Sequence, residues 1–371
     1  MTQALQEIDV LVIGAGQAGL AAGYHLARTK LSYLIVDRHA RIGDSWRCRY
    51  DSLTLFTPRA FSTLPGLTLD GDPQGYPARD EFADYLEAYA SHFDLPVLSG
   101  NGVVQLERRT DERFVAQIDD GRHIVAKAVI VATGAFQIPI IPTIGAGFDS
   151  AVAQLTPESY HNSGDVRPGT VLVVGDGASG RDIAAELVST HEVLLAVGRG
   201  RRLFPERILG RSTWWWLRAL GLMKARPGSA IGYLMRRADP FPDRGRSLGD
   251  LQRMGMAISG RLVSANGRTV TFSDGSKRVV DSVVWCIGYR DDSAWLQIPG
   301  STHSNGSFVQ EGGVAPVPGL FHLGRPWQRN RASALVMGAG EDASVVVTLC
   351  LQYCFAAIGP RTMPAERSLQ E

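Results

Sequence analysis

Residues 8–19 read IDVLVIGAGQAG, and this stretch decides the fold class. Its first six residues form an almost wholly apolar run, as parallel strands do when helices cover both faces of a sheet. Glycines follow at positions 14, 16 and 19. In a βαβ unit, Gly14 permits the tight turn, Gly16 lets the backbone approach a phosphate, and Gly19 lets the helix pack closely on the strand. The stretch therefore predicts the first half of a dinucleotide-binding unit.

The residues after Gly19 complete this unit. A helix-compatible segment, LAAGYHLARTK, is followed by a second apolar strand, LSYLIVD, which ends on Asp37. Asp37 lies 23 residues after Gly14, where an acidic side chain is suited to hydrogen bonding with the ribose hydroxyls of an adenosine group. Strand, glycines, helix, strand and acid thus occur in register, and together they predict a nucleotide site.

The same unit occurs a second time. The string TVLVVGDGASG places Gly175, Gly177 and Gly180 directly after a strand, RDIAAELVST is compatible with a helix, and HEVLLAVGR forms the second strand. Two nucleotide sites are therefore predicted in one chain.

The two units differ where their second strands end. In place of Asp37, the second unit has Gly198, followed by Arg199 and Arg201. Guanidinium groups pair with a 2′-phosphate and no carboxylate repels it, so this end favours NADPH over NADH. The alternative is that the arginines only coat a solvated turn.

Composition limits the classes to which the chain can belong. Its 371 residues suffice for two or three domains, and 44% apolar with 20% charged residues excludes a disordered chain. Lys and Arg number 38 while Asp and Glu number 37, so the net charge of +1 predicts no global attraction to nucleic acid. Four cysteines and an N-terminus without an apolar leader favour a cytoplasmic protein.

Two further strand-like segments, at 127–134 and 282–289, flank the second unit. The first reads KAVIVATG and precedes a proline-rich stretch, and the second reads SVVWCIGY. Each has the character of a chain crossing between domains. We expect an α/β fold with two Rossmann-like domains, in which residues 151–290 are inserted into a first domain formed by 1–150 and 291–371.

The C-terminal part predicts a long buried helix. The apolar stretch at 345–358 has fourteen residues, fewer than the roughly 20 that span a bilayer. We expect Glu341 and Asp342 to open this helix, because acids favour the positive end of the helix dipole. Another amphipathic helix is expected at Glu81–Phe93, with its apolar stripe in the core.

Residues 199–237 carry ten Lys or Arg and one acid, Glu206, and include three consecutive tryptophans at 214–216. We interpret them as an arginine-rich cofactor edge whose tryptophans cap a cleft. A surface helix that touches a membrane is the less favoured alternative, because a clear helical periodicity is missing.

Several strings occur in the order typical of one family: RIGDSWR (41–47), YDSLTLFTP (50–58), VIVATGAFQIPIIP (129–142) and RRLFPERILG (201–210). Over nearly the whole length, the chain resembles the flavin-containing monooxygenases among the class B flavoprotein monooxygenases, especially the short bacterial forms and the plant indole-pyruvate enzymes. The resemblance implies FAD in the first unit and NADPH in the second, hence an NADP domain inserted into an FAD domain.

The resemblance, together with the motifs, gives the candidate site residues. For FAD they are Gly14, Gly16, Gln17, Ala18, Gly19, Asp37, Arg38, Gly43, Trp46, Thr133, Gly134 and Asp342. For NADP they are Gly175, Gly177, Ser179, Gly180, Arg199 and Arg201. Candidates for the active-site wall are Trp46, Phe56 and Thr57, with no catalytic base and no metal site expected, since HExxH, GxSxG and paired Cys/His spacings do not occur.

The implied activity is oxygenation of a small organic substrate by dioxygen through a flavin C4a-hydroperoxide formed after reduction by NADPH. Suitable substrates are soft nitrogen or sulfur compounds, ketones or α-keto acids. One alternative is a flavin reductase or oxidase that makes peroxide or passes electrons to a partner, and another is a non-catalytic redox sensor. Paired thiols of a disulfide reductase do not occur, although Cys48 remains a candidate single redox thiol, and a homodimer is possible.

Overall fold

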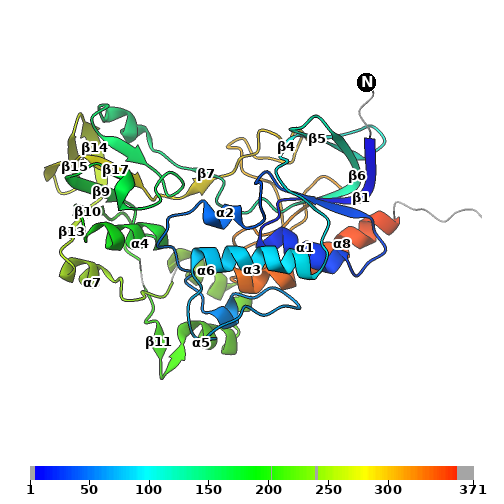
Figure 1. Cartoon of the computed structure of the whole chain (residues 1–371), viewed down its shortest axis with the longest axis horizontal. Coiled ribbons are helices and arrows are strands. Elements are labelled where there is room, and N and C mark those ends of the chain that lie inside the picture. The colour runs from blue at the N-terminus through cyan, green and yellow to red at the C-terminus, as the bar shows by residue number, and fades with distance from the viewer. Residues whose placement is uncertain (1–4, 202, 239–240, 357–371) are drawn as a thin grey trace, which may run out of the picture.

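The computed structural model describes residues 5–201, 203–238 and 241–356, which form two lobes, each built on its own sheet (Figure 1). Among these residues the first sheet has seven strands, in the order β3-β2-β1-β6-β5-β4, with β19 also paired to β6. The strands β1, β2, β3, β6 and β19 pair in parallel, whereas β5 pairs antiparallel with both β4 and β6. Their bounds are β1 Leu5–Ile13, β2 Tyr33–Val36, β3 Val97–Leu98, β4 Val103–Arg108, β5 Phe114–Ile118, β6 His123–Val131 and β19 Leu320–His322.

Alternation along β1 divides the core of this lobe into two layers. Val10 and Val12 face one cluster, and Leu11 and Ile13 face another, because successive side chains of a strand point to opposite faces. The first cluster is covered by three helices, which lie together beneath the sheet in Figure 1. They are α1 Gln17–Leu26, α3 Arg79–His92 and α8 Val336–Ala356. The predicted stripe of α3, Phe82, Tyr85, Leu86 and Tyr89, is buried there, so its assignment to the core is confirmed.

The second lobe contains a parallel sheet in the order β13-β10-β9-β17-β8. Leu172 and Leu194 face one layer, and Val171 and Val193 face the layer that contains helix α4. The bounds are β8 Ala153–Leu155, β9 Thr170–Val174, β10 Glu192–Ala196, β13 Ala257–Ser259, β17 Ser282–Trp285, α4 Ala178–Leu187 and α7 Leu248–Arg253. An antiparallel meander covers the other face: β14 Leu262–Asn266, β15 Thr269–Phe272 and β16 Lys277–Val279.

The two connections between the lobes pair with each other. The strands β7 (Ile138–Pro139) and β18 (Tyr289–Arg290) form a two-stranded antiparallel ribbon. All strands of the second sheet lie between these two in the sequence. The predicted α/β class with two Rossmann-like units is therefore confirmed, and we retain 151–290 as the proposed extent of the inserted domain.

A separate group of short elements follows β10. It comprises a hairpin, β11 (Arg207–Ile208) and β12 (Arg211–Ser212), and the helices α5 (Thr213–Ala219) and α6 (Ala230–Ala238). The hairpin projects from the body of the molecule in Figure 1. Within the described residues, no helix has both the length and the apolar character needed to cross a membrane.

The predicted start of the C-terminal helix is wrong. The helix α8 begins at Val336 and has no acid in its first turn, so Glu341 and Asp342 lie one turn further in. Gly338 and Gly340 look like helix breakers in the sequence, but both serve close packing. A Cβ atom on Gly338 would lie 2.2 Å from the Ala332 carbonyl oxygen, and one on Gly340 would contact Pro65.

Candidate functional site

The first glycine loop lies between β1 and α1, at the carboxyl end of the parallel strands. Gly14 has φ of 108°, and a Cβ atom there would lie 2.6 Å from the Ala132 carbonyl oxygen. A Cβ atom on Gly19 would lie 1.8 Å from the Gly14 carbonyl oxygen, so the helix can approach the strand only without a side chain. Gly16, in contrast, faces open space. The loop is therefore closed toward the protein and open where a ligand would approach.

Asp37 ties the end of β2 to this loop. Its Oδ2 accepts a hydrogen bond from the Ala15 N–H at 2.6 Å, and its Oδ1 accepts one from the His39 N–H at 2.8 Å. The His39 Nδ1 lies 2.9 Å from the same Oδ1. Burial alone would raise the pKa of the Asp37 carboxyl, but the hydrogen bonds from His39 and Ala15 outweigh it and lower the pKa. The carboxylate is thus held ionised beside the loop, whereas Arg38 is exposed.

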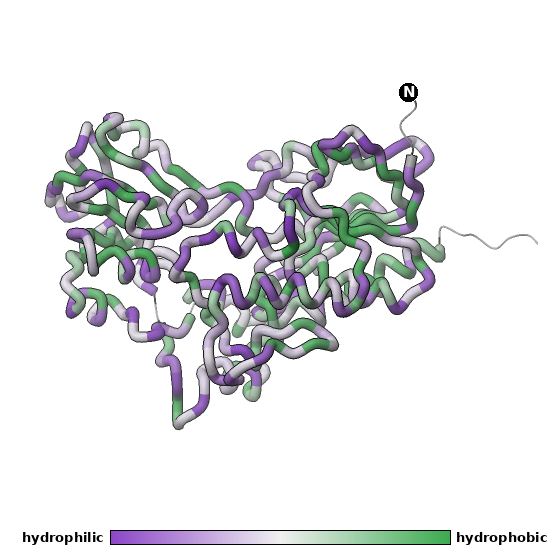
Figure 2. Tube along the Cα trace, in the orientation of Figure 1, coloured by the Kyte–Doolittle hydropathy of each residue, from purple (hydrophilic) through white to green (hydrophobic). Residues whose placement is uncertain are grey.

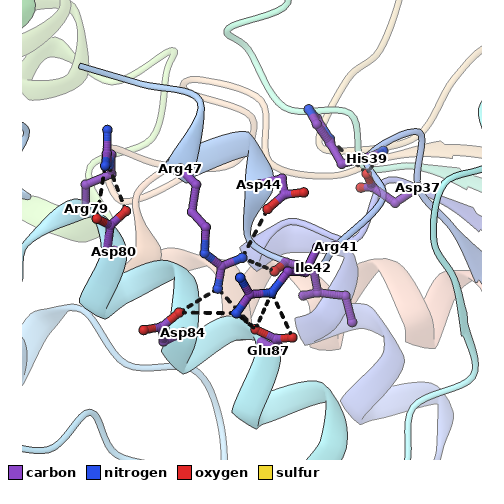
Figure 3. A network of polar contacts seen from close by, with 10 residues as sticks. All are labelled: Asp37, His39, Arg41, Ile42, Asp44, Arg47, Arg79, Asp80, Asp84 and Glu87. Atoms are coloured by element: carbon purple, nitrogen blue, oxygen red, sulfur yellow. Dashed lines mark hydrogen bonds and ion pairs between the residues drawn. The ribbon is translucent and has the colours of Figure 1, made fainter. Parts of the chain in front are cut away.

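Trp46 lies on a short helix, α2 (Asp44–Arg47), that is fixed on α3 by charged groups (Figure 3). The Arg47 guanidinium bonds Asp84 at 2.6 Å and Glu87 at 3.1 Å on α3, and Arg41 pairs with Glu87 at 2.7 Å. Gly43, with φ of 90°, caps α2, and a Cβ atom there would lie 2.5 Å from an α3 carbonyl oxygen.

The orientation of the Trp46 ring follows from this arrangement. The ring packs edge-on against Phe82, with 4.8 Å between the centroids. Its Nε1–H points to the Gln17 Oε1 in the first turn of α1, at 3.4 Å. Trp46 and the first glycine loop are therefore neighbours, while Gly43 contributes through packing on α3.

Thr133 and Gly134 follow β6 and lie at the base of the connection to the second lobe. The Gln137 amide donates to Thr133 Oγ1 at 2.8 Å and to the Gly134 carbonyl at 2.7 Å. Arg325 also donates to the Gly134 carbonyl, at 2.7 Å, and its guanidinium pairs with Asp291 beyond β18 at 2.6 Å. Both connections are thus held at the end of the first sheet.

The wall candidate Phe56 belongs to a different side-chain cluster from Trp46. The indole of Trp214 is 1% exposed, stacks at a tilt on Phe56 with 5.9 Å between the centroids, and donates to the Phe56 carbonyl at 2.8 Å. Thr57 is buried and its hydroxyl lies 2.7 Å from that of Ser62. Of the three consecutive tryptophans, Trp214 therefore packs on a predicted wall residue, while Trp215 is exposed.

Asp342 is 1% exposed on α8, and its Oδ1 accepts from Arg329 at 3.0 Å. Its Oδ2 has no hydrogen-bond partner among the described residues. Burial raises the pKa of this carboxyl, although Ser333 and Arg329 oppose the rise. The unpartnered oxygen is costly unless a ligand or water satisfies it.

The second glycine loop repeats the first. Gly175 has φ of 105°, and a Cβ atom there would lie 2.4 Å from the Cys286 carbonyl oxygen. A Cβ atom on Gly180 would lie 1.9 Å from the Gly175 carbonyl oxygen. A Cβ atom on Gly177 would have the Arg201 Nη2 as its nearest neighbour, at 4.0 Å, so a guanidinium lies over the open side of this loop.

An acid within the second loop, Asp176, forms ion pairs with two arginines. Asp176 is 5% exposed, and its carboxylate lies 3.2 Å from the Arg181 Nη2 and 3.8 Å from the Arg201 Nε. Ser179 lies in the first turn of α4, and Arg199 is exposed. The structure therefore brings Arg201 to the glycine loop.

Sequence reasoning missed a polar cluster between the two lobes. Asp182 on α4 is buried and pairs with Arg244 at 3.0 Å, with Arg246, and with the Tyr50 hydroxyl at 3.2 Å. Arg244 also donates to the carbonyls of Thr54 and Leu55. A cavity of about 320 Å³ beside this cluster is lined by Ser52, Asp182, Glu186, Arg244, Arg246 and Met254. Thr54 and Arg244 alone are 190 positions apart, so local spacing gives no signal for this cluster.

The cysteines give no sign of a thiol pair at the first glycine loop. Cys350 and Cys354 are buried in α8, Cys286 is partly buried beside Gly180, and Cys48 is exposed after α2. Burial raises the pKa of the Cys286 thiol to about 12, so this thiol stays protonated.

Comparison with known proteins gives consistent matches. Residues 11–207 match the pyridine nucleotide-disulphide oxidoreductase family. An uncharacterized oxidoreductase, CzcO-like, of Geobacillus kaustophilus is 43% identical and aligns over 93% of this chain and 99% of its own length. A probable indole-3-pyruvate monooxygenase of Arabidopsis thaliana is 28% identical, over 89% of this chain and 88% of its own.

A solved structure agrees with these matches. A flavin-containing monooxygenase from Stenotrophomonas maltophilia superposes with a TM-score of 0.79 at 28% identity, over 94% of this chain and 99% of that one. The predicted family is confirmed, and with it a flavin-dependent enzyme with a flavin cofactor. The chain belongs to the pyridine nucleotide-disulphide oxidoreductase family and, within it, to the flavin-containing monooxygenases.

Proposed function

We propose that the chain is an FAD- and NADPH-dependent monooxygenase that oxygenates a small organic substrate. The observation that carries this proposal is the pair of glycine loops, each packed against protein backbone at its outer glycines and open at the middle glycine. Relatives named as flavin and indole-3-pyruvate monooxygenases support the reaction class. The substrates we expect carry a soft nitrogen or sulfur, or are ketones or α-keto acids.

The first loop fits an adenine dinucleotide. Gly16 is the N-cap residue of α1 and no side chain caps the helix, so its first backbone N–H groups remain available to a pyrophosphate. Asp37 stays ionised and is the acceptor for ribose hydroxyls. The unpartnered Oδ2 of Asp342 is a third polar group that a ligand in this lobe would satisfy. These features fit FAD, with Thr133, Gly134 and Trp46 near the loop as its further neighbours.

The second loop fits NADPH. Gly177 is likewise the N-cap residue of α4 and no side chain caps the helix, so α4 offers N–H groups to a pyrophosphate. Arg201 lies over this loop, where its guanidinium would pair with a 2′-phosphate. Ser179 and Arg199 are further proposed contacts.

Bound FAD, once reduced by NADPH, would supply the centre that activates dioxygen, so that one oxygen atom enters the substrate and the other leaves as water. The chain itself positions the reactants and excludes water. Trp46 is oriented by Gln17 and Phe82, and Phe56 is backed by the buried Trp214. No side-chain base is assigned.

The test begins with the purified protein. We expect it to be yellow, to release FAD on denaturation, and to be bleached by NADPH faster than by NADH under anaerobic conditions. Aerobic turnover with a thioether or a ketone should then form product in proportion to NADPH consumed. Peroxide formed one-to-one with NADPH for every substrate would show an oxidase instead, and protein that takes up no flavin would refute the proposal.

A further inference from the structure

The turn between β11 and β12 has a backbone conformation that is unfavourable for the leucine it contains. Its two turn residues, Leu209 and Gly210, both have positive φ, 49° and 74°. Such a turn selects Asn-Gly or Asp-Gly, because a branched side chain is strained in the left-handed region. Leu209 is nevertheless at the tip and is 87% exposed. A strained and exposed leucine on a projecting hairpin indicates a function for that side chain outside the fold.

The segment that carries the hairpin has a buried and an exposed side. Trp214, Leu217 and Met223 are buried in a cluster with Phe61. Outside this cluster, Ile208, Leu209, Trp215 and Leu220 are 38%, 87%, 37% and 67% exposed. Figure 2 shows the hairpin tip as a hydrophobic point at the edge of the molecule.

Contacts join the hairpin to α5 as one surface. The Trp216 Nε1–H donates to the Ile208 carbonyl at 2.9 Å, and the Arg211 guanidinium lies 4.4 Å from the centroid of the Trp215 ring. We call the exposed side chains of residues 207–220 the hairpin surface.

Charge is concentrated in the same part of the chain. Residues 199–237 hold ten of the 38 Lys and Arg but only one of the 37 Asp and Glu. The remainder of the chain therefore carries 28 cationic and 36 acidic residues. Arg207, Arg211 and Arg218 are all exposed beside the apolar side chains. An anionic surface would attract this part and repel the rest, which fixes the orientation of approach.

We propose that the hairpin surface binds the interface of an anionic phospholipid bilayer, with Leu209 inserted among the lipids and the arginines at the headgroups. A second copy of the chain is a poorer occupant, because a symmetric contact would place like charges against one another. A nucleic acid would use the arginines but leave Leu209 and Trp215 without a partner. A bilayer interface satisfies both, since it combines apolar insertion with anionic headgroups. This inference does not depend on the proposed oxygenation.

The test uses flotation of the full holoprotein with two kinds of vesicle, pure phosphatidylcholine and phosphatidylcholine with phosphatidylglycerol. We expect binding to the anionic vesicles, with a loss of binding at high salt as the arginines are screened. The L209N variant should bind at least several-fold more weakly. Its melting temperature should stay the same or rise, because Asn tolerates the left-handed region better than Leu.

Matched control variants at other exposed positions test whether binding depends on the hairpin surface. V263N changes an exposed valine on β14, 53% exposed, and should leave flotation unchanged. The pair R207Q/R211Q should reduce flotation, while R261Q/R278Q, which removes two exposed arginines elsewhere, should not. Absence of flotation with anionic vesicles, or equal flotation of L209N and V263N, would overturn the proposal. Dissociation of a dimer by L209N without vesicle binding would assign this surface to a second copy instead.

Discussion

The two glycine loops share their backbone but differ in where the acid is placed. At Gly14 and Gly175 the φ values are 108° and 105°, and a Cβ atom added to the helix glycines Gly19 and Gly180 would lie 1.8 and 1.9 Å from a carbonyl oxygen. In the first unit the acid is Asp37 at the end of β2, and it accepts from the N–H of the loop residue Ala15. In the second unit the acid is Asp176 within the loop.

The acid of the second unit pairs with arginines, whereas that of the first unit accepts hydrogen bonds from backbone N–H groups. Asp176 occupies the loop position that corresponds to Ala15, and its carboxylate faces Arg181 in α4 and Arg201 beyond β10. One unit thus presents a carboxylate near its ligand position and the other presents a guanidinium. Under the proposed function, this exchange of charge would direct the same scaffold to FAD in one unit and to NADPH in the other, while the loop geometry stays constant.

The largest effect is expected from G19A and G180A, which test the shared scaffold. In a helix alanine is favoured over glycine by about 1 kcal/mol. A Cβ atom 1.8–1.9 Å from a carbonyl oxygen must displace backbone, which we expect to cost about 3 kcal/mol or more and to outweigh that gain. Urea unfolding should show both variants strongly destabilised, with flavin lost from G19A.

G16A is the control for this comparison. Gly16 has an extended backbone and faces open space, so its replacement should change stability by no more than about 0.5 kcal/mol. It should still weaken flavin retention if the ligand passes close to this residue. Equal stability of G16A and G19A would show that close packing of α1 is not what Gly19 provides.

D37N tests the acid of the first unit. Loss of the charge weakens the hydrogen bonds from Ala15 and His39, and we expect a cost of about 1–3 kcal/mol at neutral pH, together with weaker flavin binding. The folded-state pKa of Asp37 is lowered, so its stabilisation is present above the unfolded pKa of about 4 and is lost as pH falls through the folded pKa.

Unfolding at a series of pH values checks this sign. The difference between wild type and D37N should be largest above about pH 5 and should shrink toward more acidic pH. A difference that grew on acidification would mean that the carboxyl is protonated in the folded protein.

R201Q tests the charge of the second unit and has the smallest expected effect. Loss of one charge-assisted pair should raise the KM for NADPH by about 10- to 100-fold and leave that for NADH nearly unchanged. R278Q, at an exposed arginine on β16, is the matched control. If R201Q raised both KM values equally, Arg201 would serve the loop through Asp176 and not the 2′-phosphate.

Local patterns were sufficient for much of this molecule. The glycine spacing, the apolar strands and the stripe of α3 predicted two βαβ units and the core face of a helix, because each depends on residues close in sequence. The start of α8 was mispredicted because glycines such as Gly338 and Gly340 usually interrupt a helix. Their role becomes visible only beside Ala332 and Pro65.

Parts of the site depend on contacts between distant segments. The pairing of Asp182 with Arg244 and Tyr50 joins three parts of the chain, and no spacing rule connects them. The strain at Leu209 is likewise visible only from its backbone angle, since the sequence Leu-Gly does not predict a positive φ. Such features follow from tertiary structure, which overrides the local preference of the chain.

The ribbon of β7 and β18 determines how the two units can move relative to each other. Because the strands are hydrogen bonded to one another, the outgoing and returning passages of the chain cannot bend separately. Gln137 adds to this, since its Oε1 accepts from the Asp292 N–H at 2.7 Å. Any swing of the second lobe therefore bends both passages together at this ribbon, and it also has to break the hydrogen bonds of Arg244 to the carbonyls of Thr54 and Leu55.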